Sequence, residues 1–255
     1  MPVIVFINDW KGGDYYRAML EGWLFSFNPE IQLRFINTHV RLYDVYEAGL
    51  ILRSCFFNFP EETIFVIGVK SVVPEELGYV YARVQNRHIF CANNGILTFV
   101  MDEHSEELYA LPYVETTFAE KDIFLPAIVH LLEKKEMSEI TEPVSSVMKM
   151  NNLYPSFSKN ILIGMVIYND VYGNAVTNIS RNYFEKCAAD RNYVIYPGTR
   201  HEHISHIYNY YPVLEAAQLF AVFNTLNLLE LGIYENDISS LFNLKPRTNI
   251  TIEFI

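Results

Sequence analysis

Asp9 and Asp14 are the first residues whose types and spacing suggest a binding site. Asn8 and Asp9 bound an apolar run over residues 3–7, which predicts a strand buried on both faces. Ligands of open α/β sheets bind beyond the carboxyl ends of such strands, and a carboxylate there can accept several hydrogen bonds. An aspartate in a turn or near a helix start also has a purely structural role, and that alternative stays open for both residues.

Gly12 and Gly13 lie between these carboxylates and could form a phosphate-binding loop. The pattern GxGxxG is absent, a lysine precedes the pair, and two carboxylates would repel a phosphate. We therefore do not expect a nucleotide-phosphate site in this loop.

Asp170, Tyr172 and Asn174 form a second polar group within a single short segment. Asp, Gly and Asn are typical turn residues, so the segment predicts a hairpin turn, whether or not it also binds a ligand. His201, His203 and His206 match no zinc spacing, and the three cysteines show no CxxC pattern, so we expect neither a metal site nor a disulfide framework.

The elements that would position Asp9 alternate between strands and helices. Apolar residues at helical spacing predict helices over 15–27 and 44–57, and apolar runs predict strands over 33–36 and 63–69. This alternation indicates parallel βα units. We therefore expect an α/β fold whose N-terminal domain is a Rossmann-like α/β/α sandwich with a mainly parallel sheet.

The first half is predicted to end with two strands and a helix. Strands over 88–91 and 96–100 would flank a turn at Asn93-Asn94-Gly95, since an Asn-Gly step readily supplies positive φ. A helix over 124–132 follows.

A segment rich in charge, serine and proline separates the two halves of the chain. Residues 141–158 are predicted to link an N-terminal domain over 1–140 to a smaller domain over 159–255.

The second half is predicted to be mainly β and barrel-like. Strands are expected over 161–168, 175–179 and 249–254, whereas Leu, Ala, Glu and Gln favour a helix over 213–231.

Composition restricts the partners of the protein. Thirty acidic residues against 19 basic ones give a net charge of -11, which would repel a nucleic-acid backbone. No stretch approaches the ~20 apolar residues of a membrane span, and the N-terminal apolar run lacks the flanks of a signal peptide. We expect a cytoplasmic protein that binds neither nucleic acid nor membrane.

Several segments, in order along nearly the whole chain, resemble the S-adenosylmethionine (SAM) hydroxide adenosyltransferase and fluorinase family. NDWKGGDYY at 8–16 is similar to the family's opening, with its Thr-Asp-Phe-Gly, Asp and Tyr. ANNGIL at 92–97 and DVYGN at 170–174 resemble its Pro-Asp-Asn-Gly-Leu-Leu and Asp-x-Phe-Gly-Asn segments. Further matching segments lie at 38–39, 117–126, 177–179 and 209–217.

The resemblance implies a homotrimer that binds an adenosyl ligand between the N-terminal domain of one subunit and the C-terminal domain of its neighbour. It implies that Asp9 accepts the ribose hydroxyls, Asp14 faces the methionine amino group, and Tyr172 stacks on a flat face of the ligand. The residues implied to bind the ligand are Asp9, Asp14, Tyr16, Asn93, Asp170, Tyr172, Asn174 and Asn209. No separate cofactor is expected, because SAM would itself be ligand or substrate.

The residues with which the family activates water are replaced. Its Asp, Arg and His positions fall on Lys70, Leu77 and Ala119. Lys70 and Glu120 could form a replacement acid–base pair, although a structural ion pair is the simpler interpretation. We therefore expect binding of SAM or adenosine without the family's hydrolysis. An active SAM hydrolase with a rebuilt catalytic centre and a non-enzymatic trimeric scaffold remain as alternatives.

Overall fold

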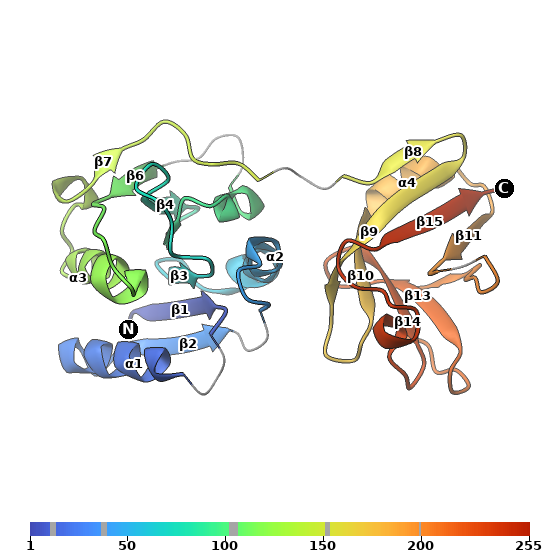
Figure 1. Cartoon of the computed structure of the whole chain (residues 1–255), viewed down its shortest axis with the longest axis horizontal. Helices are drawn as coiled ribbons and strands as arrows, with labels where there is room; N and C mark the ends of the chain where they lie inside the picture. The colour runs from blue at the N-terminus through green and yellow to red at the C-terminus, as the bar shows by residue number, and fades with distance from the viewer. Residues whose placement is uncertain (11–13, 37–39, 102–106, 151–153, 199) are drawn as a thin grey trace. The chain divides into compact units, whose positions relative to one another are not determined.

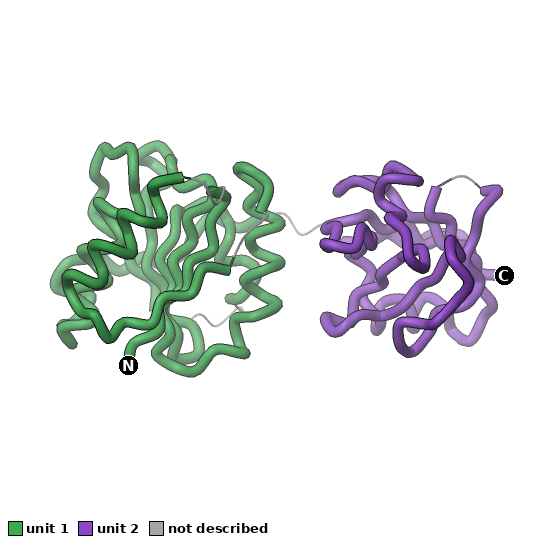
Figure 2. Tube along the Cα trace, turned by 90° about the horizontal axis from the view of Figure 1, so that it is seen from below, with its two compact units in different colours: residues 1–151 green, residues 152–255 purple. Residues whose placement is uncertain are grey.

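The computed structural model describes residues 1–10, 14–36, 40–101, 107–150, 154–198 and 200–255 (Figure 1). The chain divides into two compact units, Met1–Asn151 and Asn152–Ile255 (Figure 2). Gly12, Gly13 and the segment 38–39 that resembles the family lie outside the described residues. Each unit is described below by itself.

Unit 1 is built on a seven-stranded sheet in the order β2-β1-β3-β5-β4-β6-β7. β2, β1, β3 and β5 pair in parallel, but β4 pairs antiparallel with β5 and β6, and β6 antiparallel with β7. The sheet is therefore mixed, and the prediction of a mainly parallel sheet is wrong in this respect. The described elements of unit 1 are β1 (Val3–Asn8), α1 (Tyr15–Phe27), β2 (Gln32–Ile36), α2 (Val45–Cys55), η1 (Phe56–Asn58), β3 (Ile64–Gly68), β4 (Tyr79–Val84), β5 (Arg87–Ala92), η2 (Ile96–Phe99), β6 (Glu107–Leu111), η3 (Glu120–Phe124), α3 (Leu125–Leu132), η4 (Met137–Glu139) and β7 (Glu142–Pro143).

Helices cover both faces of this sheet, which explains why the run at 3–7 is apolar throughout. Ile4 and Phe6 pack in a cluster with residues of α1 and α3, whereas Val5 and Ile7 pack in a second cluster with residues of α2. Successive side chains of a strand point to opposite faces, so a strand covered on both sides needs apolar residues at every position. Unit 1 is thus an α/β/α sandwich (Figure 1).

The segment after the Asn93-Asn94-Gly95 turn differs from its prediction. Gly95 has φ 95°, the positive value expected of an Asn-Gly step, but Ile96–Phe99 is a short 3-10 helix and not a strand. Ile96 and Leu97 are buried in the cluster on the α2 side of the sheet. A short apolar run fits a buried helical turn as well as a strand, and here tertiary packing chooses the turn.

Unit 2 is a curled sheet that forms a half-barrel. Its strand order is β11-β15-β9-β10-β14-β13-β12, with β8 paired to β9. Its described elements are β8 (Ser156–Ser158), β9 (Ile161–Asn169), β10 (Ala175–Ser180), α4 (Arg181–Ala188), β11 (Tyr193–Tyr196), β12 (Ile207–Tyr208), β13 (Leu219–Phe223), β14 (Leu228–Ile233), α5 (Ile238–Leu241) and β15 (Asn249–Phe254). Leu162, Ile179, Leu231 and Ile252 are fully buried in its single described core.

The helix predicted over 213–231 is wrong, because this segment contains the antiparallel hairpin of β13 and β14. Asn224 forms the turn: its Oδ1 accepts hydrogen bonds from the backbone N–H groups of Leu226 at 3.0 Å and Leu228 at 3.2 Å. Intrinsic helix preference is a weak prior, and burial of β14 between two neighbouring strands outweighs it.

Candidate functional site

Asp9 lies at the carboxyl edge of the unit 1 sheet. Asn8, which precedes it, pairs with Gly68 in the parallel register between β1 and β3. The side chain of Asp9 is buried, and its Oδ2 accepts a hydrogen bond from the backbone N–H of Tyr43 at 2.7 Å. Asp9 does not cap α1, because Asp14 occupies that N-cap position. A carboxylate offers about four acceptor positions, so the bond to Tyr43 leaves capacity for a ligand.

Tyr43 is a residue of this edge that sequence reasoning missed. Its φ is 64°, in the left-handed region that bulky residues rarely adopt, and its side chain is exposed. The bond to Asp9 helps to hold this backbone in place directly before α2. Nothing in the sequence around position 43 signals this conformation.

Glu120 places a second carboxyl group at the same edge. It begins the π-helical turn η3 before α3, and only 2% of its surface is exposed. Its Oε1 has no hydrogen-bond partner, and a Cβ added at Gly68 would overlap that oxygen. Gly68 is thus the residue that lets the carboxyl group approach the end of β3.

The surroundings of Glu120 favour its protonated form. Burial raises the pKa of Glu120, a hydrogen bond with the Ser71 side chain opposes this, and the charge of Asp9 raises the pKa further. The structure therefore brings Asp9 and Glu120 close enough to interact electrostatically. Such a carboxyl group can exchange a proton nearer to neutral pH than an exposed glutamate can.

Aromatic residues that lie close to these carboxyl groups in sequence form a cluster of their own. Trp10, Tyr16 and Phe118 contact one another, with ring centroids 4.9–5.5 Å apart. A hydrogen bond with Tyr15 raises the pKa of Tyr16, and the charges of Asp14 and Glu120 raise it further. Carboxylates beside aromatic faces suit a ligand that carries positive charge and flat groups.

Asp14 and Asn93 differ in how much of their side chain is already engaged. Asp14 is exposed, and although it holds the N-cap position of α1, its side chain makes no capping hydrogen bond. Asn93 Oδ1 accepts a hydrogen bond from the backbone N–H of Met148 at 2.7 Å, which ties down the chain after β7. Its neighbour Asn94 is buried and donates to the carbonyls of Val69 at 3.0 Å and Lys70 at 3.3 Å.

The expected ion pair between Lys70 and Glu120 is not formed. Lys70 is exposed, and within the described part of the chain no carboxylate oxygen lies within 4.0 Å of its amino group. Leu77 is 37% exposed, and Ala119 is buried. Of the two replacement candidates, only Glu120 lies inside the protein.

In unit 2, Asp170 supports the turn between β9 and β10. Its Oδ1 accepts from the backbone N–H groups of Tyr172 at 3.0 Å and Asn174 at 2.8 Å, and its Oδ2 accepts from the Asn174 side chain at 3.1 Å. Asn174 is buried, whereas Tyr172 is 77% exposed. The turn is thus internally hydrogen-bonded and presents one aromatic ring outward.

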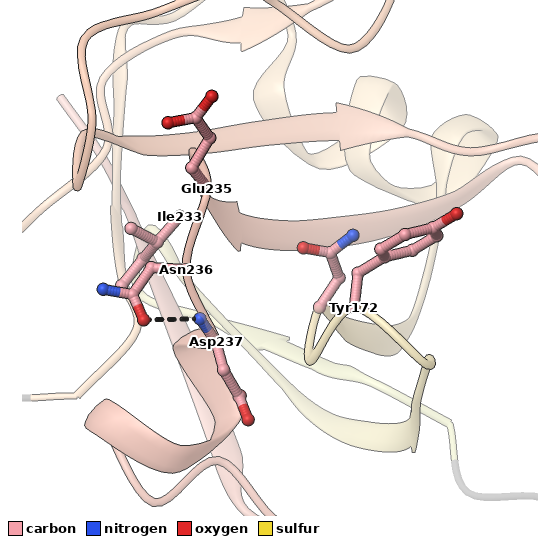
Figure 3. A pocket seen from close by; sticks show the side chains of 6 residues that line it. Tyr172, Ile233, Glu235, Asn236 and Asp237 are labelled. Atoms are coloured by element: carbon pink, nitrogen blue, oxygen red, sulfur yellow. Dashed lines mark hydrogen bonds between the residues drawn. The ribbon is translucent and has the colours of Figure 1, made fainter.

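A pocket of about 350 Å³ adjoins this turn. It is lined by Tyr172, Asn174, Ile233, Glu235, Asn236 and Asp237, and Figure 3 shows Tyr172 on a different segment from Glu235 and Asp237.

Tyr211, in the segment after β12, interacts electrostatically with Asp170 of the same turn. Burial and a hydrogen bond with Glu230 raise its pKa, and the charge of Asp170 contributes as well. Asn209, two residues before it, is exposed, as is Tyr210.

The segment 201–206 carries three histidines that are candidate metal ligands by residue type. His201, His203 and His206 are exposed, and among the described residues no group of three or more His, Cys, Asp or Glu could hold a metal ion. Within the same ranges, no helix has the length and apolar character needed to cross a membrane.

The fold and these groups define a two-unit α/β protein with acidic and aromatic side chains at the carboxyl edge of its first sheet. Residues 4–141 match the SAM hydroxide adenosyltransferase N-terminal domain, and residues 164–251 match the SAM hydroxide adenosyltransferase C-terminal domain. The chain therefore belongs to the SAM hydroxide adenosyltransferase family.

Solved structures share the fold along the whole chain. An uncharacterized conserved protein from Thermotoga maritima is 21% identical with a TM-score of 0.85, covering 98% of this chain and 99% of that one. A conserved hypothetical protein from Thermus thermophilus is 17% identical with a TM-score of 0.76, and the match covers 100% of both chains. No curated protein matches the sequence.

Proposed function

We propose that this protein binds S-adenosylmethionine, or a related adenosyl compound such as adenosine. The observation that carries the proposal is the buried carboxylate of Asp9 at the carboxyl end of β1, followed in the chain by Trp10, whose ring packs against that of Tyr16. In the proposed complex Asp9 accepts the ribose hydroxyls, and Asp14, which makes no capping bond, faces the methionine amino group. Family membership supports this assignment.

We propose further that the complete site forms between subunits of a homotrimer, as the family resemblance implies. The turn of unit 2 would supply Tyr172 as a stacking face, with Asp170, Asn174 and Asn209 around it. Tyr172 and Tyr210 are 77% and 75% exposed in the single chain. Large exposed aromatic side chains are typical of surfaces that bind a ligand or a neighbouring subunit. Light scattering coupled to size-exclusion chromatography tests the trimer: a monomer mass would contradict it.

Titration calorimetry with SAM and with adenosine tests binding. Asp9→Asn should weaken the binding of both ligands about 10²-fold or more, because a bidentate acceptor becomes part donor and loses its charge. Asp190→Asn is a matched control, since Asp190 is exposed after α4 and its φ of 63° suits asparagine equally well. No heat from either ligand with the unaltered protein would refute the proposal and favour the trimeric scaffold.

A further inference from the structure

Glu120 is a buried ionisable group of unit 1 that the proposed binding role does not use, and unlike buried Glu47 it forms no ion pair among the described residues. Only 2% of the surface of Glu120 is exposed, and its Oε1 has no hydrogen-bond partner. This oxygen lies against the end of β3, where the missing side chain of Gly68 leaves space for it. A buried polar atom without a partner is costly and rare in native proteins, so its retention needs an explanation. An acid–base function at a ligand-binding edge provides one.

We propose that Glu120 is the proton acceptor for a water molecule that attacks the C5′ carbon of bound SAM. The inference rests on the proposed binding function, in which Asp9 fixes the ribose. Glu120 Oε1 lies against Gly68, and Gly68 pairs with Asn8 directly before Asp9, so a ribose held by Asp9 would bring its C5′ carbon to the same edge. Glu120 thereby becomes the catalytic base of a hydrolase.

The proposed step balances without a further reactant. The water oxygen forms a bond to C5′ while the bond between C5′ and sulfur breaks, and that electron pair neutralises the sulfonium. Methionine leaves as a neutral thioether, and the proton of the water passes to the Glu120 carboxylate and then to solvent. The products are adenosine, methionine and one proton.

The groups around Glu120 suit this role. Ser71 hydrogen-bonds the carboxyl group and opposes the rise of its pKa, so that a fraction of the carboxylate remains available as a base. Among the described residues, the titratable groups that interact electrostatically with Glu120 include Asp9, Tyr16 on α1 and Tyr79 on β4. Burial raises the pKa of Tyr79, and the pKa of Tyr16 is raised chiefly by Tyr15, so both phenols stay neutral where Glu120 titrates.

The test measures adenosine release from SAM by chromatography between pH 5 and 9, together with SAM affinity by calorimetry. Glu120→Gln should retain binding but release adenosine about 10²-fold more slowly or less, the usual contribution of a general base. Glu136→Gln, at an exposed position after α3, makes the same change of charge and should act like the unaltered protein.

Ser71→Ala gives a second readout that a structural role would not move. Removing its hydrogen bond should shift the midpoint of the pH–rate profile to higher pH while leaving the plateau rate within a few-fold.

Three outcomes would overturn the inference. SAM that binds but yields no adenosine would leave the binding function intact and eliminate the catalytic base. Unchanged release by Glu120→Gln would assign the proton to another group. Absence of SAM binding would remove the proposed function and this inference together.

Discussion

Replacing Glu120 by glutamine should stabilise unit 1 at alkaline pH, because the folded protein buries this carboxyl group and thereby disfavours its charged form. Burial raises its pKa above that of the unfolded chain, which is about 4.3 for glutamate. The contribution of Glu120 to stability is therefore complete below about pH 4.3 and is lost as the pH rises through the folded-state pKa. Glutamine has a similar shape and no charge, so it avoids this loss.

The size of the effect follows from the burial of the group. A buried polar group without its partner costs about 1–3 kcal/mol, and a charged one tends to the upper part of this range or beyond. A domain about 150 residues long changes its melting temperature by about 2–4 °C per kcal/mol. We therefore expect Glu120→Gln to raise the melting temperature of unit 1 by about 2–12 °C at pH 8.

Calorimetric melting of both proteins between pH 5 and 9 tests this expectation. The advantage of Glu120→Gln should grow with pH and level off above the folded-state pKa of Glu120. Glu136→Gln should show no such trend, since Glu136 is exposed. A variant that melts at or below the unaltered protein at pH 8, or a difference that does not change with pH, would refute the reasoning.

Three further predictions concern other parts of the fold. Gly68→Ala should destabilise unit 1 by about 1–3 kcal/mol, because its Cβ would overlap the Glu120 carboxyl group; thermal melting checks this, and a cost that persists fully in a Glu120→Gly background would contradict that cause. Burial lowers the pKa of His88, so its contribution to stability is lost as the pH falls below about 6.5 through the folded-state pKa; His88→Gln should flatten the melting temperature between pH 7.5 and 5, and an unchanged slope would exclude His88 as the cause. Asp170→Ala should cost about 1–3 kcal/mol in urea unfolding because three hydrogen bonds are lost, whereas exposed Tyr172→Ala should change stability by less than about 0.5 kcal/mol; equal effects would contradict the described turn.

Local sequence patterns were sufficient to predict the strand before Asp9 and the helix after it. β1 and α1 begin and end within a residue of their predicted bounds, because a run without polar residues and a repeat at helical spacing each match one element. The mixed character of the sheet could not be predicted, since β4 and β6 were not recognised and strand direction is fixed by pairing across the sheet. The same holds for β13 and β14, where pairing outweighed helix preference.

The sequence by itself determined the family resemblance, the strand before Asp9 and the turn that contains Asp170. Only the tertiary structure shows that Glu120 is buried and that its pKa is raised. Glu120 stands among charged neighbours in a segment that could equally have been exposed. Only the π-helical turn that carries it and the missing Cβ of Gly68 bring its carboxyl group into the interior near Asp9. Burial, and with it the altered proton affinity, arises from contacts between distant segments, which no local pattern of residues contains.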